Sequence, residues 1–145
     1  MHPDVLGEPF AAPSVIRIDQ QVVTQMIEAG RQTLPYEFSA LLTGQGNRIT
    51  GLIRQPSETA ALHRFAWEGE ALIRAMRQMH EAEQQWLGVV HTHPHTAPLP
   101  SAADLSGWHY PMLSYWILSF AEVEPALRCY RWQGTGFAAY PYEMV

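Results

Sequence analysis

The segment HTHPHTAPLPSAAD, residues 91–104, constrains the fold more than any other stretch of this chain. An apolar run turns polar at its end here, and Pro94 cannot donate the next backbone hydrogen bond, so the pattern predicts a strand over residues 87–93. In an extended strand, residues two apart face the same side, so His91 and His93 present both imidazoles together. That spacing suits a shared metal ion.

Asp104 is the third candidate ligand. It follows a proline-rich loop and falls in the first turn of a short helix predicted to begin at Ser101, so the chain can fold back and bring a carboxylate to the histidines. Three protein ligands and one open position are typical of catalytic zinc, whereas structural zinc sites use more cysteine. Non-haem iron uses the same donors, so the ligand types leave both metals open.

Ser101 and Asp104 also fit a helix cap, with Ser101 at the N-cap and Asp104 near the positive end of the helix dipole. The two roles of Asp104 are compatible, because one carboxylate oxygen can face a metal while the other accepts from a backbone N–H. From spacing alone, a cap and a metal ligand are both consistent with this aspartate.

Outward from this segment, helices and strands alternate irregularly. One helix is predicted to be capped by Asp19 and to end between Gly30 and Pro35, and a longer one to cover residues 70–86. The predicted strands cover residues 39–43, 48–55, 61–67, 87–93, 115–120 and 127–133, with a last strand after residues 134–136. This order predicts an α+β fold, a mixed, largely antiparallel sheet flanked by two main helices.

The 145 residues suit a single domain. Residues 1–14 contain three prolines and a glycine without a period, which predicts an irregular lead-in, and the domain is expected over residues 15–145. The sequence has neither a signal-peptide pattern nor an apolar stretch long enough to span a membrane, so we expect a cytoplasmic protein with no membrane partner.

The charged residues argue against a nucleic-acid partner. The net charge is −5, and all nine basic residues are arginine, without a basic cluster. The absence of lysine excludes P-loop and Schiff-base lysine chemistry. The lone Cys129 excludes an internal disulfide and, lying in an alternating strand pattern, is expected to be a buried, inert thiol.

Together these residues resemble the JAMM (MPN-plus, Mov34/PAD-like) zinc metalloprotease family. Its signature is His-x-His-Pro, a variable loop and Ser-x-x-Asp, as in residues 91–94 and 101–104. The segment PYEFSALLTG, residues 35–44, is similar to a second family feature, with Glu37 shortly after a proline and before an apolar run that ends in glycine. The resemblance implies a compact, prokaryotic-type member with the cytidine-deaminase-like JAMM/MPN fold.

By this resemblance, His91, His93 and Asp104 ligate Zn²⁺, Glu37 is the general base, and Ser101 hydrogen-bonds to the tetrahedral intermediate. The implied activity is a metallopeptidase that cleaves an amide or isopeptide bond after the C-terminal tail of a protein. Because the chain lacks room for the insertions with which eukaryotic members grip ubiquitin, we expect a small ubiquitin-like sulfur-carrier protein as substrate. His95 is expected to lie outside the ligand set.

Two other functions stay open at this stage. One is a catalytically silent MPN-type scaffold, because the family includes members that lost their ligands and assemble with partners. The other is a cupin-like non-haem metal enzyme, which also uses His-x-His but is built on a β-barrel. A homodimer is compatible with the sequence as well.

Overall fold

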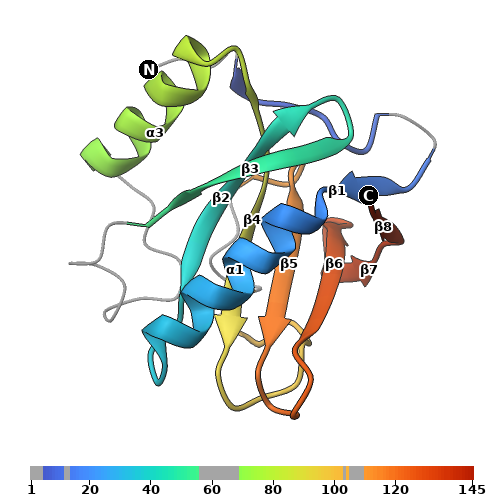
Figure 1. The fold of residues 1–145 in the computed structure, drawn as a ribbon. Coiled ribbons are helices and arrows are strands. Elements are labelled where there is room, and N and C mark those ends of the chain that lie inside the picture. Colours follow the sequence, from blue (N-terminus) through green and yellow to red (C-terminus); the bar gives the residue numbers. More distant parts are fainter. Residues whose placement is uncertain (1–4, 12–13, 56–68, 103, 105–109) are drawn as a thin grey trace.

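A computed structural model describes residues 5–11, 14–55, 69–102, 104 and 110–145 (Figure 1). The predicted strand over residues 61–67 lies outside these ranges. The helices are α1 (Gln20–Thr33) and α3 (Gly69–Glu81). The strands are β1 (Ile16–Ile18), β2 (Ser39–Gln45), β3 (Arg48–Arg54), β4 (Gln85–His93), β5 (Ser114–Ser119), β6 (Ala126–Trp132), β7 (Phe137–Ala139) and β8 (Tyr142–Met144).

All eight strands form one sheet in the order β7-β6-β5-β4-β2-β3-β1-β8. Strand β1 runs parallel to β3 and to β8, and β4 runs parallel to β5. The other neighbouring pairs are antiparallel, including the predicted β2–β3 hairpin. The predicted α+β class with a mixed, largely antiparallel sheet is therefore confirmed.

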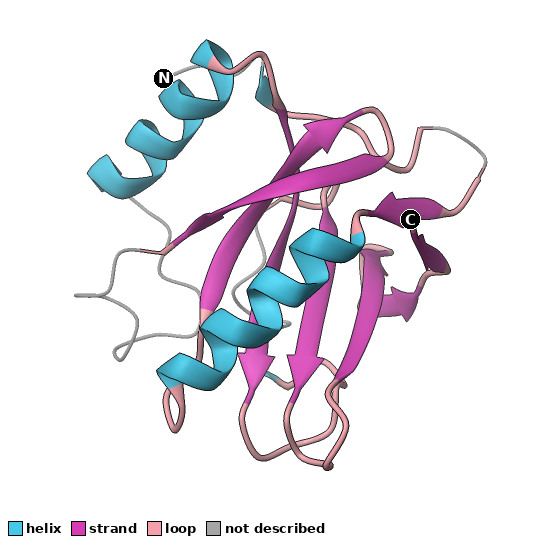
Figure 2. Cartoon of the chain, in the orientation of Figure 1, coloured by secondary structure: helices cyan, strands magenta, loops and turns pink. Residues whose placement is uncertain are grey.

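The two helices cover opposite faces of this sheet (Figure 2). Helix α1 buries one apolar stripe, which packs on a core that includes Val90, Trp116 and Leu118. Helix α3 buries Leu72, Met76 and Met79 against the other face, where Leu41, Val89 and Ile117 lie. Strands β4 and β5 are buried on both faces, so their sequences read as nearly continuous apolar runs.

Gly30 lets α1 approach the sheet closely. A Cβ built at this position would lie 2.8 Å from the Phe120 ring and 3.0 Å from the Thr92 methyl group. Helix α1 ends at Thr33, between Gly30 and Pro35, as predicted. Asp19 occupies the N-cap position, but its carboxylate makes no cap bond and instead pairs with Arg48 at 2.9 Å.

The prediction of a helix over residues 70–86 is wrong at its C-terminal end. Helix α3 ends at Glu81, Glu83 adopts a positive φ of 56°, and β4 begins at Gln85. Trp86 matched the helical spacing, but its side chain is buried in β4 with its ring 4.7 Å from the Tyr110 ring. Trp86 packs in the same core as α3, so its position fits the spacing of a helix as well as the alternation of a strand.

The predicted last strand is divided into β7 and β8. Strand β7 pairs with β6 at one edge of the sheet, and β8, which begins at Tyr142, pairs with β1 at the other edge, so the sheet curls until its two edges lie close together (Figure 1). Among the described residues, no helix combines the length and the apolar content needed to cross a membrane.

Candidate metal centre

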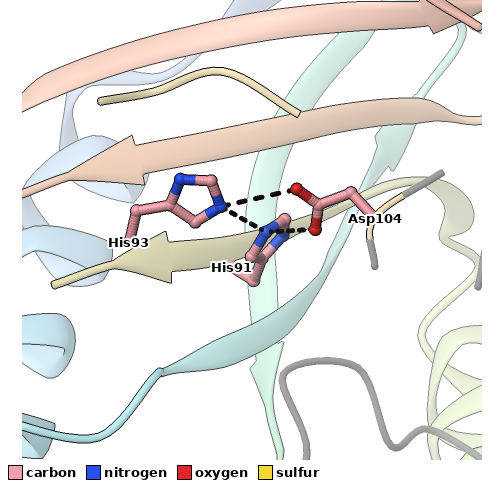
Figure 3. A group of neighbouring side chains, drawn as sticks. All are labelled: His91, His93 and Asp104. Atoms are coloured by element: carbon pink, nitrogen blue, oxygen red, sulfur yellow. Dashed lines mark hydrogen bonds and ion pairs between the residues drawn. The ribbon is translucent and has the colours of Figure 1, made fainter. Parts of the chain in front are cut away.

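The candidate ligands meet at the C-terminal end of β4, on the face that packs against α3. His91 Nε2 lies 3.2 Å from His93 Nε2 and 2.9 Å from Asp104 Oδ1, and His93 Nε2 lies 3.5 Å from Asp104 Oδ2 (Figure 3). All three residues are buried. Strand alternation thus brings the two imidazoles together as predicted, and the chain folds back to bring Asp104 to them.

These distances fit a zinc ion. Zinc binds imidazole nitrogen and carboxylate oxygen at about 2.0–2.2 Å, so the ligand atoms of a tetrahedral site lie about 3.3–3.6 Å apart, close to and slightly wider than the 2.9, 3.2 and 3.5 Å separations here. The ligand atoms of His91, His93 and Asp104 all lie within 4.8 Å of one another. The donor set contains no sulfur, and the two nitrogens with one oxygen leave a fourth position.

Asp104 is held in place from three sides. Its Oδ2 accepts hydrogen bonds from the Ser101 N–H at 2.6 Å and the Ser101 hydroxyl at 3.0 Å, while its own N–H donates to Ser101 Oγ at 3.2 Å. Its Oδ1 accepts from the Tyr115 hydroxyl at 2.9 Å. This aspartate therefore caps the chain at Ser101 and faces the histidines at the same time.

The electrostatics favour an ionised Asp104. Burial alone would raise the pKa of this carboxyl, but hydrogen bonds from His91 and His93, the charge of His91 and the Ser101 N–H hold the pKa well below its usual range. The result is a buried carboxylate that a cation can neutralise.

His93 is oriented by the loop that follows it. Its Nδ1 lies 2.8 Å from the Ala97 carbonyl oxygen, so an N–H at Nδ1 leaves the lone pair of Nε2 for a metal. Burial lowers the pKa of His93, but hydrogen bonds to Asp104 and Ala97 and the charges of Asp104 and Glu37 outweigh it, and the pKa is raised. This loop is tied to the sheet by hydrogen bonds that Ser119 donates to the Thr96 carbonyl and Tyr130 to the Pro98 carbonyl.

Glu37 lies beside this centre, in the segment that connects α1 to β2. The neighbouring Phe38 is fixed to β4, because its N–H donates to Thr92 Oγ1 at 2.8 Å and its carbonyl accepts from the Thr92 N–H at 2.9 Å. Glu37 lines a cleft together with His93, Ser101 and the exposed His95. The charge of Glu37 acts on His93, which indicates that the two side chains are close.

The sequence did not reveal the residues that support this centre. The hydroxyl of Tyr115 contacts Asp104, although its place in an apolar run indicates only a core residue. Thr92 anchors the backbone beside Glu37, a contact with no signal in the sequence. The Ala97 carbonyl carries no sequence signal, and the contact of Tyr115 depends on the pairing of β4 with β5. His91 Nδ1 is buried and has no hydrogen-bond partner among the described residues.

Comparisons with known proteins identify a related family and related folds. The model of the family described as prokaryotic homologs of the JAB domain matches residues 19–133. No curated protein matches the chain significantly. A solved protein from Desulfitobacterium hafniense is 26% identical with a TM-score of 0.76, and the alignment covers 90% of this chain and 93% of that one.

Two more distant structures share the fold. A JAB1/MPN domain protein from Archaeoglobus fulgidus is 21% identical, has a TM-score of 0.61, and covers 91% of this chain and 99% of its own. A structure described as a metalloprotease-like zinc site in the proteasome and signalosome is 22% identical, has a TM-score of 0.58, and covers 91% of this chain and 99% of its own.

Proposed function

This chain belongs to the prokaryotic JAB-domain family, and from that premise we propose that it is a zinc-dependent metallopeptidase. The proposed reaction is hydrolysis of the amide or isopeptide bond after the C-terminal tail of a small ubiquitin-like, sulfur-carrier-type protein. The observation that carries the proposal is the group of His91, His93 and Asp104, whose ligand atoms fit zinc and which adjoins the cleft that Glu37 lines.

Zinc, when bound by these three residues, supplies an activated water and polarises the substrate carbonyl. Glu37 accepts the proton of the attacking water and returns it to the leaving amine, a role that contributes about 10²- to 10⁴-fold in general acid–base catalysis. Thr92 supports this role, because its two hydrogen bonds with Phe38 fix the backbone next to Glu37 relative to the strand that carries both histidines.

Ser101 has two roles in this proposal. Its hydroxyl donates to Asp104 in the structure, which orients the carboxylate. Because Ser101 also lines the cleft, its hydroxyl can turn to donate to the oxyanion that forms during hydrolysis. His95 lines the same cleft but is not part of the three-residue group.

A protein substrate is supported by the surroundings of the cleft. Leu34 and Tyr36 flank Pro35, which lines the cleft, and they are 40% and 56% exposed. Leu99, in the loop after His93, is 64% exposed. These exposed apolar side chains are available to contact a protein substrate near the cleft. The carrier substrate, the cytoplasmic location and the homodimer stay predictions.

The cupin-like alternative has less support. The chain matches the JAB-domain family over residues 19–133, and the described sheet carries a helix on each face. A scaffold would have the same fold but would not hydrolyse a bond, so an activity measurement separates the two functions.

The test is cleavage of a ubiquitin-like sulfur-carrier protein that bears a peptide extension after its C-terminal tail. The zinc-loaded wild-type protein is expected to release the extension, with the carrier mass falling by the mass of the peptide. The matched Glu37→Gln variant is expected to retain one zinc per chain and to cleave at least about 10²-fold more slowly. A folded, zinc-loaded wild-type protein that leaves every carrier intact would support the scaffold instead.

A further inference from the structure

Gln55, directly after β3, carries a buried amide that finds no hydrogen-bond partner within the part of the chain that the structure describes. The residue is 7% exposed, and neither its Oε1 nor its Nε2 has a partner among the described residues. An amide that leaves water without replacing its hydrogen bonds costs free energy. Because buried polar side chains are nearly always satisfied in native proteins, this one suggests a ligand that satisfies it.

This amide lies in the same row of residues as the candidate metal centre. The Gln55 N–H donates to the Ser39 carbonyl at 3.0 Å, and Ser39 in turn pairs with His91 across β2 and β4. Strands β3, β2 and β4 are adjacent in the sheet (Figure 1). Paired residues of neighbouring strands project to the same face, so Gln55, Ser39 and His91 share one face.

The packing of Ile53, two residues before Gln55, supports the direction in which the Gln55 side chain points. Ile53 and Leu41 are paired, and both belong to the core under α3, the face on which the metal centre lies. Gln55 follows Ile53 by two residues, so its side chain points to the same face.

The distances along this row match a short length of extended polypeptide. Neighbouring strands lie about 4.8 Å apart, which places Gln55 about 10 Å from His91. That span equals about three extended residues, which advance about 3.3 Å each. Glu37 lies two residues before Ser39, at the entrance to β2.

We propose that Gln55 binds the main chain of the substrate's extended tail, about three residues before the scissile bond. This inference rests on the proposed peptidase function. The amide offers an acceptor oxygen and two donor hydrogens, which together match the N–H and C=O of one extended residue, because these two groups point to the same side of the strand. Because the contact is with the main chain, Gln55 selects for the length of the tail and not for its sequence.

The test compares two substrates, tails of two and of six residues joined to the same fluorogenic amine. The wild-type protein is expected to cleave the six-residue tail with the higher kcat/KM. Gln55→Met, which keeps the size of the side chain and removes the amide, is expected to lose roughly 5- to 100-fold on the longer tail, the value of two hydrogen bonds. It should cleave the two-residue tail as the wild type does.

Thermal unfolding distinguishes a binding role of Gln55 from a purely structural role. A structural role predicts a lower Tm for Gln55→Met. Removing an unsatisfied buried amide should leave the Tm of Gln55→Met equal to or above that of the wild type. The matched control is Gln25→Met on α1, which covers the opposite face of the sheet and should change neither the tail-length preference nor zinc content.

An unchanged preference for the longer tail in Gln55→Met would overturn the inference, as would a lower Tm with unchanged kinetics. Should Gln55→Met not fold, NMR of the Glu37→Gln protein decides the question. The Gln55 side-chain amide signals are expected to shift when the six-residue tail is added, and stationary signals would overturn the inference. A wild-type protein that cleaves no substrate would instead overturn the proposed function, and the Gln55 assignment with it.

Discussion

The hydroxyl group of Tyr115 should be required for tight zinc binding. It donates to Asp104 Oδ1 at 2.9 Å, and both side chains are buried, with Tyr115 2% exposed. Tyr115→Phe removes this donor and keeps the ring, which stacks on Phe137 at a centroid distance of 4.5 Å. The change therefore isolates the hydrogen bond from the packing.

The magnitude follows from the charge of the acceptor. A hydrogen bond to an ionised group contributes about 1.5–3 kcal/mol, and loss of a group that orients a metal ligand typically lowers metal affinity about 10- to 100-fold. We expect a loss of zinc affinity in this range, measured by competition with a chromophoric chelator at constant pH.

A matched control separates an effect on the zinc site from an effect on the stability of the whole protein. Tyr142→Phe also removes a hydroxyl, which donates to the Leu127 carbonyl at 2.8 Å, but this tyrosine packs against the core under α1. It should lower the free energy of unfolding without changing zinc affinity. If Tyr115→Phe binds zinc as tightly as Tyr142→Phe does, Asp104 does not depend on Tyr115 and the reasoning fails.

Three further results are expected. Zinc affinity should fall as the pH drops from 8 to 6, because the raised pKa of His93 lets protons compete with the metal above the usual histidine range, and a pH-independent affinity would contradict this. Burial raises the pKa of the Cys129 thiol, so iodoacetamide should label it only after unfolding, as mass spectrometry would show. Gly30→Ala should destabilise the protein in urea by about 1–3 kcal/mol through overpacking against Phe120 and Thr92, whereas an increase in stability would mean that helix propensity prevails.

Local sequence patterns predicted much of this architecture. The hairpin of β2 and β3 and the apolar strands β4 and β5 follow from alternation, apolar runs and turn residues. The meeting of His91 and His93 follows from strand geometry alone, because their side chains must share a face. These features depend on neighbours in sequence, which is why they could be predicted.

Features that depend on pairing between distant segments could not be predicted. The end of α3 was placed too late because Trp86 faces the same core as the helix and so fits its spacing. The division of the last strand reflects pairing of β8 with β1, at the other end of the chain. The contact of Tyr115 with Asp104 likewise requires tertiary structure, and the role of Glu37 came from family resemblance, since nothing in its local sequence indicates a base.

X-ray absorption spectroscopy at the zinc edge, on protein purified without added metal, tests the central claim most directly. We expect one zinc per chain, bound by His91, His93 and Asp104 through nitrogen and oxygen alone at about 2.0–2.2 Å. The scattering from atoms beyond the ligands should show two imidazole rings. Stoichiometric iron in place of zinc, or a sulfur ligand at about 2.3 Å from Cys129, would contradict the assignment of this centre.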